Sequence, residues 1–277
     1  MNASAPRVSV CIPTYKGAQT LGAAIESVLA QTLTDFELVV IDDRSPDGTR
    51  ELVASYADAR IRYLRNDTNL GPEGNWNRCL LAARGTYFKL LPHDDVLHPA
   101  CLQRQVEVFG ADHAQGIALV FSAREVLGPK GQLLTRRGYP GGREGRLQAR
   151  EVIGACVRRG TNLLGEPGAV MMRKSLADRV GLFDATFPYV IDLDYWFRLL
   201  QHGDAYYCGE TLAGFRVSGS QWSVAIGSRQ SQDFRRFVAR LKAQGTLSAT
   251  ALDRGFGFFT PALNNVARLL FYRFYLR

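Results

Sequence analysis

The segment Arg7-Val-Ser-Val-Cys-Ile-Pro-Thr-Tyr15 begins with six residues typical of a short buried strand, which Pro13 ends. Thr20 stands where the following helix would begin, and we expect it to cap that helix. The apolar residues after it fall on one helical face: Leu21, Ala24, Ile25, Val28 and Leu29. A buried strand followed by an amphipathic helix is the repeating unit of sheets that are covered by helices.

The same alternation continues along the N-terminal half of the chain. Residues 37–41, 61–64 and 87–91 have the pattern of short strands, and residues 47–56 and 75–83 have that of helices. Strands separated by helices at this spacing predict parallel pairing, with the helices on the faces of the sheet. We therefore expect an α/β fold with a mostly parallel central sheet.

The C-terminal half alternates less regularly. We expect helices at 99–109, 149–159, 174–180, 192–202 and 228–244, and strands at 117–123, 169–172, 205–208 and 212–217. The Gly- and Arg-rich segment 124–149 predicts a hairpin or a mobile loop. Residues 256–277 mix apolar residues with Arg268, Arg273 and Arg277. That mixture suits an amphipathic helix that lies on a membrane, on the body of the protein or on a second subunit.

Composition and charge limit the function classes. The chain has 277 residues, 46% of them hydrophobic and 22% charged, which fits one large α/β domain or two small ones. Its formal charge of +8 favours anionic partners, but no interleaving of aromatic and basic residues indicates a nucleic acid partner. Five scattered cysteines suit neither a disulfide framework nor a zinc site. With no apolar leader and no stretch long enough to span a membrane, we expect a cytoplasmic protein.

Polar clusters follow the first four expected strands at the point where each strand ends. They are Pro13-Thr14-Tyr15, Asp42-Asp43-Arg44-Ser45, residues 66–74, and Pro92-His93-Asp94-Asp95. Ligands of open parallel sheets bind at the carboxyl ends of the strands, where loops and helix N-termini converge. The four clusters therefore predict a binding site at one edge of the sheet.

Asp94 and Asp95 form the most suggestive pair. Adjacent carboxylates after a buried strand can hold a hard divalent cation, whereas in a purely structural role Asp95 would cap a turn and Asp94 would be solvated. Asp42 and Asp43 leave the same two alternatives open, because their loop could also be a helix cap.

Asp192 and Asp194 start an expected helix. The helix dipole alone would favour both carboxylates there. If the helix points at the same cleft as the strand ends, one of these carboxylates could act as a general base.

A set of short motifs runs through these clusters. They are Val8-Ser-Val-Cys-Ile-Pro-Thr-Tyr15, Asp35-Phe-Glu-Leu-Val-Val-Ile-Asp-Asp43, Asn69-Leu-Gly-Pro72, Leu91-Pro-His-Asp-Asp-Val-Leu-His-Pro99, Gly181-Leu-Phe-Asp184 and Asp192-Leu-Asp-Tyr-Trp-Phe-Arg-Leu199. Together they resemble the family 2 glycosyltransferases, which have the Rossmann-like GT-A fold. The resemblance is dense over residues 7–110 and thins after Ala123.

The resemblance implies an inverting transfer of a sugar from a nucleoside diphosphate donor to a hydroxyl of a glycan or glycolipid, in surface polysaccharide biosynthesis. UDP-sugars are the first candidates as donor, with dTDP- and GDP-sugars as alternatives. The residues carried over to the nucleoside pocket are Pro13, Thr14, Tyr15 and Asp43, of which Asp43 would accept a hydrogen bond from the base. By position, Asp94 would face the ribose or sugar, Asp95 would hold Mn²⁺ or Mg²⁺ on the diphosphate, and Asp192 would be the catalytic base.

The resemblance also implies a domain division. Residues 1–220 would form the catalytic domain, with the nucleotide half at 1–110 and the half that carries the acceptor side and the base at 111–220. Residues 221–277 would form a C-terminal helical extension, through which the protein would contact the inner face of the membrane or a second copy of itself.

Two positions depart from the family pattern. Ile191 stands where members often have a glutamate before the catalytic aspartate, and Ser218 stands where many have a histidine. The second change predicts weaker metal binding or compensation by Arg216 on the phosphates. A sugar-phosphate nucleotidyltransferase and a non-catalytic nucleotide-sugar binder are the alternatives. The first usually carries a glycine-rich basic loop that residues 13–18 lack.

Overall fold

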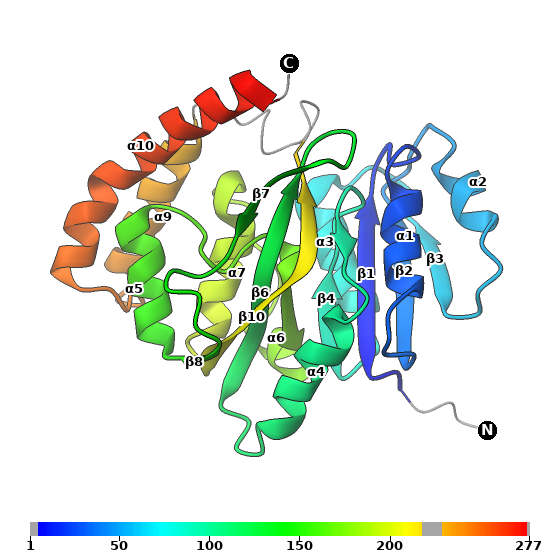
Figure 1. Cartoon of the computed structure of the whole chain (residues 1–277), viewed down its shortest axis with the longest axis horizontal. Coiled ribbons are helices and arrows are strands. Elements are labelled where there is room, and N and C mark those ends of the chain that lie inside the picture. The colour runs from blue at the N-terminus through cyan, green and yellow to red at the C-terminus, as the bar shows by residue number, and fades with distance from the viewer. Residues whose placement is uncertain (1–4, 218–228, 276–277) are drawn as a thin grey trace.

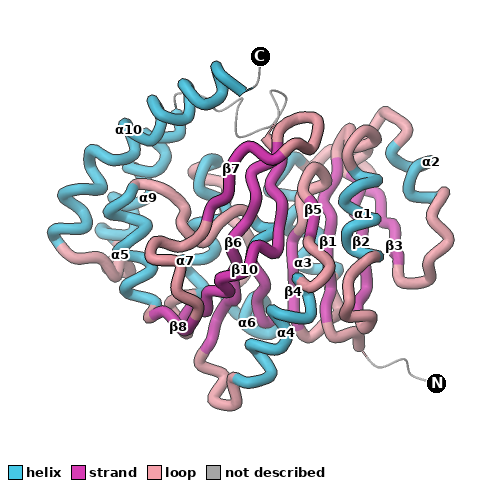
Figure 2. Tube along the Cα trace, in the orientation of Figure 1, coloured by secondary structure: helices cyan, strands magenta, loops and turns pink. Residues whose placement is uncertain are grey.

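The computed structural model describes residues 5–217 and 229–275, with side chains to residue 270. Its centre is one twisted sheet with the strand order β3-β2-β1-β4-β9-β6-β10-β5, with β7 paired to β6 and β8 to β10 (Figure 1). Helices lie on both faces of this sheet (Figure 2). The expected α/β architecture is thereby present.

The N-terminal half follows the sequence pattern closely. Its strands β1 (Val8–Thr14), β2 (Phe36–Asp42), β3 (Ile61–Arg65) and β4 (Tyr87–Leu90) all pair in parallel. The helices between them are α1 (Leu21–Leu29), α2 (Thr49–Ala54) and α3 (Gly71–Ala82). One detail of the prediction is wrong: Thr20 precedes α1, but its side chain makes no capping hydrogen bond.

The C-terminal half of the sheet is mixed. It contains β5 (Val96–Leu97), β6 (Ile117–Leu127), β7 (Leu133–Arg137), β8 (Gly145–Leu147), β9 (Val170–Arg173) and β10 (Asp204–Arg216). β9 runs antiparallel between β4 and β6, whereas β10 is parallel to β6. The expected strands 205–208 and 212–217 are one strand, because irregular pairing around Thr211 lets β10 continue past Gly209. Segment 124–149 contains the β6–β7 hairpin, and β5 was not predicted.

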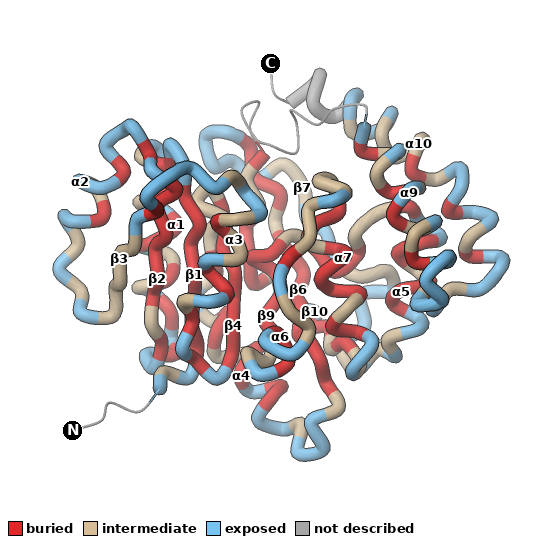
Figure 3. The backbone as a smooth tube through the Cα atoms, turned by 180° about the vertical axis from the view of Figure 1, so that it is seen from behind, coloured by how far each residue is buried: buried red, intermediate tan, exposed pale blue. Residues whose placement is uncertain are grey.

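Two apolar layers hold the helices on the sheet. On one face, α1 and α4 (Cys101–Ala111) bury residues such as Ile25 and Phe109, and the Phe109 ring stacks on Tyr87 of β4. On the other face, the layer includes Phe88 and Trp196 and is covered by α3, α5 (Ala149–Arg159), α6 (Lys174–Val180) and α7 (Ile191–Leu199). Figure 3 shows the central strands mostly buried, and the helices buried where they meet the sheet and exposed on their outer sides.

Two further helices complete the described chain. α9 (Gln230–Ala243) buries Phe234 and Phe237 in the layer beside α7. α10 (Ala251–Tyr275) packs along α5 and α9 at the outer edge of the molecule (Figure 1). Residue 220, the predicted domain boundary, lies outside the described residues.

Candidate active site

The ends of the parallel strands gather as predicted. The Asp43 N–H donates to the Thr14 carbonyl (2.8 Å), and the Asn66 N–H donates to the Asp42 carbonyl (2.9 Å). Pro13 and Thr14 are buried at the end of β1, whereas Tyr15 is 42% exposed in the loop that follows. The Thr14 hydroxyl is buried without a hydrogen-bond partner. These residues form a floor of backbone and small side chains with one exposed aromatic ring at its rim.

Asp42 and Asp43 organise this edge in different ways. The Asp42 carboxylate accepts hydrogen bonds from the Ser45 N–H (2.8 Å) and the Tyr63 hydroxyl (2.6 Å), which is a structural role. The buried Asp43 carboxylate accepts from the Leu70 N–H (2.8 Å) and the Gly71 N–H (2.9 Å) ahead of α3. Together with an Asn66 amide donor (2.8 Å), Asp43 uses three of the roughly four bonds that a carboxylate can accept. Asp43 therefore fixes the loop before α3 and keeps room for one more donor.

Asp94 and Asp95 lie in the loop after β4. Arg216, at the end of β10, donates its N–H to the Asp95 carboxylate (2.9 Å) and its Nε–H to the Asp94 carbonyl (3.0 Å). Asp95 is only 2% exposed, so its carboxyl is removed from bulk water. Burial, followed by the neighbouring charge of Asp94, raises the pKa of Asp95 well above its ordinary value.

This environment fits a divalent cation that is held jointly with a ligand. Asp95 is a buried carboxyl next to a second acid, and a bound cation would favour its ionised form. Within residues 5–217 and 229–275, no three His, Cys, Asp or Glu side chains cluster closely enough to form a complete metal site. Mg²⁺ and Mn²⁺ commonly take one or two carboxylates and fill the remaining positions with phosphate oxygens and water. Asp95, assisted by Asp94, could supply the protein ligands of such a site.

Asp192 and Asp194 have separated roles. Asp194 is ion-paired with Arg198 (2.8 Å) and Arg240 (2.7 Å), so it anchors α7 against α9. Among the side chains that the structure describes, none forms an ion pair with Asp192, whose oxygens accept hydrogen bonds from the Asn162 amide (2.9 Å) and the Leu193 N–H (2.7 Å). Desolvation is the largest cause that raises the pKa of Asp192, to about 7, with a contribution from the charge of Glu166. A partly protonated carboxylate near pH 7 is suited to accept a proton during a reaction.

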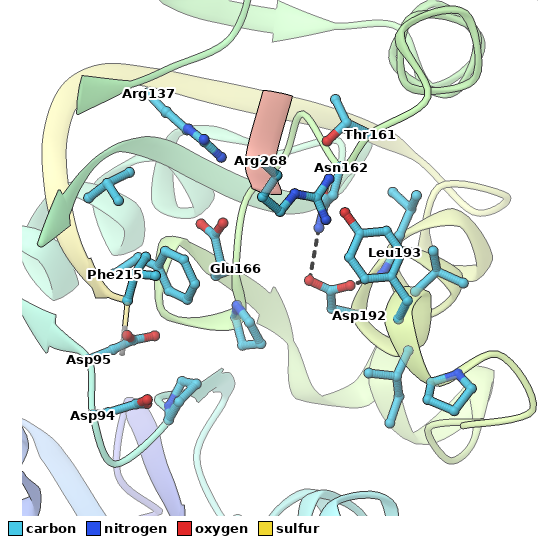
Figure 4. A pocket seen from close by; sticks show the side chains of 18 of the residues that line it. Asp94, Asp95, Arg137, Thr161, Asn162, Glu166, Asp192, Leu193, Phe215 and Arg268 are labelled. Carbon is cyan, nitrogen blue, oxygen red and sulfur yellow. Dashed lines mark hydrogen bonds between the residues drawn. The ribbon is translucent and has the colours of Figure 1, made fainter. Parts of the chain in front are cut away.

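A single cavity of about 240 Å³ joins these groups. Asp94, Asp95, Glu166 and Asp192 all line it (Figure 4). Figure 4 shows Glu166 between Asp95 and Asp192, with Arg137 and Arg268 on the opposite side. The arrangement can bind a phosphorylated ligand near Asp95 and deliver a hydroxyl to Asp192 within the same space.

Several residues that line the cavity belong to none of the sequence motifs. Asn162 and Glu166 lie between α5 and the short 3₁₀ helix Pro167–Ala169, and both line the cavity. Glu166 is half-buried and pairs with Arg124 of β6. The Gly165-Glu-Pro-Gly168 turn ahead of a strand was the only signal that could have drawn attention to them. Arg268 reaches the cavity from α10, more than 70 residues beyond Asp192 in sequence.

Of the two positions that depart from the family pattern, the structure describes only one. Ile191 is buried and also lines the cavity, while Glu166 brings a carboxylate to the same space from another segment. Ser218 lies outside the described residues, so the predicted effect of its change stays a prediction.

Comparison with known proteins decides the family. Glycosyl transferase family 2 matches residues 9–181. The chain belongs to this family. The central sheet with helices on both faces matches solved structures of GT-A glycosyltransferases, which confirms the predicted fold class. The family assignment also favours a glycosyltransferase over a nucleotidyltransferase or a binder without activity.

Sequence relatives of this glycosyltransferase include polysaccharide enzymes. The chain is 34% identical to the uncharacterized protein MT1568 of Mycobacterium tuberculosis over 72% of its own length and 64% of that protein's. It is 28% identical to the Escherichia coli WfgD, a UDP-Glc:α-D-GlcNAc-diphosphoundecaprenol β-1,3-glucosyltransferase, with 83% of each protein covered. It is 42% identical to the succinoglycan biosynthesis protein ExoO of Rhizobium meliloti over 40% of this chain and 32% of that protein. These relatives therefore include a protein of succinoglycan biosynthesis and a glucosyltransferase whose acceptor is a lipid-linked sugar.

Structural relatives share the fold at low identity. TarS 1–349 of S. aureus, solved with UDP-GlcNAc, has a TM-score of 0.67 at 16% identity and covers 98% of this chain and 76% of its own. The Pyrobaculum calidifontis mannosyltransferase PcManGT, solved with GDP-Man and Mn²⁺, has a TM-score of 0.66 at the same identity and with the same coverage of each chain.

Proposed function

We propose that this glycosyltransferase moves a sugar from a nucleoside diphosphate donor to a hydroxyl of a lipid-linked glycan, with inversion at the anomeric carbon. The observation that carries the proposal is the shared cavity, which holds a buried carboxylate at the strand ends and a second carboxylate with a pKa of about 7. UDP-sugars are the first candidates, because TarS was solved with UDP-GlcNAc and WfgD uses UDP-Glc.

The donor would lie along the strand ends. Pro13, Thr14 and Tyr15 would line the nucleoside pocket, and Asp43 would accept one further hydrogen bond from the base. Asp94 would face the ribose or the sugar at the entrance of the cavity. This placement directs the diphosphate toward Asp95.

Asp95 would hold a Mn²⁺ or Mg²⁺ ion on the diphosphate, and that ion would stabilise the charge that develops on the leaving group. PcManGT, solved with Mn²⁺, supports this choice of cation. The backbone N–H of Arg216 keeps one Asp95 oxygen oriented while the other is available to a ligand.

Asp192 would act as the general base. It would take the proton of the acceptor hydroxyl while that oxygen attacks the anomeric carbon from the face opposite the diphosphate. The bond from carbon to the diphosphate oxygen breaks, and its electron pair leaves with the nucleoside diphosphate. Asn162 holds the Asp192 carboxylate in place, because its amide donates to one oxygen and its own oxygen accepts from the Leu164 N–H (3.0 Å).

A transfer assay tests the proposal. The protein is incubated with UDP-, GDP- and dTDP-sugars, Mn²⁺ and a diphosphopolyprenol-linked sugar, and the product's anomeric configuration is read by NMR. We expect one donor to give an inverted product and the free nucleoside diphosphate, and Asp192→Asn to lose transfer. Asp178→Asn, which changes an exposed acid outside the cavity, is the matched control. A product with retained configuration would contradict the mechanism.

A further inference from the structure

Helix α10 is amphipathic in the inverted sense: its polar side chains face the protein and its apolar side chains face outward. Asp253 pairs with Arg158 of α5 (2.8 Å), and Asn264 donates to the carbonyls of Arg159 and Gly160 at the end of α5. The residues turned away from the body are large and exposed: Leu252, Phe256, Phe258, Phe259, Leu263, Val266, Leu269 and Leu270. These eight residues are called the outer face of α10 below.

Most of the large hydrophobic side chains that are exposed in the described residues lie on the outer face of α10. Among the described residues, thirteen large hydrophobic side chains are exposed, and eight of them belong to α10. Figure 3 shows α10 at the edge of the molecule, with exposed residues recurring along its described part. A contiguous apolar surface of this kind marks a binding surface for a partner or a membrane.

The width of the outer face favours a planar partner. At 100° per residue, the arc from Phe258 to Phe256 covers roughly 160° of the helix circumference. The apolar strip by which one helix pairs with another in a coiled coil is narrower, because it uses only two of every seven positions. A broad arc with several phenylalanines is the pattern of helices that lie in the plane of a bilayer surface. No helix in the described part of the chain combines the length and apolar content needed to cross a membrane.

Arginines border both long edges of the outer face. On one edge, Arg158 and Arg159 line a hollow of about 430 Å³ together with Phe256 and Thr260. On the other edge, the guanidinium of Arg235 lies 5.0 Å from the centre of the Phe258 ring. Basic residues along the borders of an apolar face match a bilayer that carries anionic head groups. The formal charge of +8 also favours binding to an anionic surface.

We infer that α10 docks this enzyme on the surface of an anionic lipid bilayer, with the outer face in the acyl boundary and the flanking arginines at the lipid phosphates. The opposite side of the same helix carries Arg268, whose guanidinium lies over the Tyr189 ring (5.0 Å) and lines the cavity of Asp192. Thr161 lines both that cavity and the arginine hollow. Docking through α10 therefore sets the catalytic cavity beside the bilayer, where a lipid-linked acceptor resides. This last step rests on the proposed function, whereas the docking itself does not.

Vesicle co-sedimentation tests the docking without any substrate. The full chain is mixed with vesicles of equal parts phosphatidylglycerol and phosphatidylcholine, and with pure phosphatidylcholine vesicles. We expect binding to the anionic vesicles, weakened by salt, and a loss of about tenfold in the partition coefficient for each of Phe259→Ser and Leu263→Ser. Leu81→Ser is the matched control, because Leu81 on α3 is as exposed (66%) as these residues and lies outside α10.

Two further measurements complete the test. Nucleotide binding by calorimetry shows that the variants are folded, and we expect it to be unchanged in all three. The inference is overturned if the native protein ignores anionic vesicles, or if the α10 variants bind them as tightly as Leu81→Ser does. It is also overturned if light scattering shows a dimer that Leu263→Ser dissociates while vesicle binding is absent, since a second copy then covers the outer face. Failure of sugar transfer with intact vesicle binding would count against the proposed function alone.

Discussion

The environment of Asp192 predicts an unusual pH dependence of sugar transfer. The ordinary pKa of an aspartate is 3.8, and desolvation in the cavity raises that of Asp192 to about 7. A general base works only when it is ionised. The ionised fraction would fall from about one half at pH 7 to about one hundredth at pH 5, so kcat would fall about fiftyfold over this range. With an ordinary aspartate as base, kcat would fall by only about 6% between the same pH values.

The assay follows release of the nucleoside diphosphate at saturating donor and acceptor between pH 5 and pH 9. We expect log kcat to rise with unit slope up to about pH 7 and to level above it. Asp192→Asn should lower kcat by roughly 10²- to 10⁴-fold and remove this slope, while the donor Kd stays within about twofold. The control Asp178→Asn should keep the native profile. A native profile that is flat from pH 5.5 to pH 8.5, or a folded Asp192→Asn that loses donor binding as fully as transfer, would refute the assignment of the base.

Four further substitutions test the surroundings of the site and the core. Asn162→Asp replaces the amide donor that lowers the pKa of Asp192 with a second carboxylate, so the acid limb of the kcat profile should move to higher pH; an unmoved limb would exclude this coupling. The buried Lys89 ammonium donates to Gln105 (2.8 Å), and burial lowers its pKa, so Gln105→Leu should cost about 1–3 kcal/mol in urea unfolding at pH 7. Lys89→Met should leave the free energy of unfolding at pH 7 unchanged or raise it, and this gain over the native protein should grow as the pH falls below 10.5. A large loss of stability in this variant would show that the ammonium is needed. Gly85→Ala should cost about 1–3 kcal/mol, because the added Cβ would lie 2.5 Å from a backbone nitrogen of β1, and an unchanged urea midpoint would contradict that packing.

Most of the fold could be predicted from the periodicity of the sequence. Helical spacing in α1 and apolar runs in β1 and β2 are local signals, and the strand ends therefore fell on one edge as predicted. The two residues of β5 have no pattern of their own, because they are held by pairing with β10. The merger of two expected strands into β10 depends on a pairing irregularity near Thr211, which sequence periodicity does not encode.

The site was predictable only in part. Asp95 and Asp192 follow from motifs at the end of a strand and the start of a helix, whereas Glu166 and Asn162 come from a turn with no periodic signal. The distinction between Asp192 and Asp194 depends on two arginines from α7 and α9, and hence on tertiary packing. The pKa of Asp192 likewise arises from burial, which no spacing of residues reveals.

The most direct test of the central claim is calorimetric binding of UDP, GDP and dTDP with and without Mn²⁺, to the native protein and to Asp95→Ala. We expect one nucleotide to bind in a manner that requires Mn²⁺, and this binding to disappear in Asp95→Ala and to survive in Asp192→Asn. Absence of binding by all three nucleotides, or binding that Asp95→Ala leaves intact, would contradict a donor site built on the buried carboxylate at the end of β4.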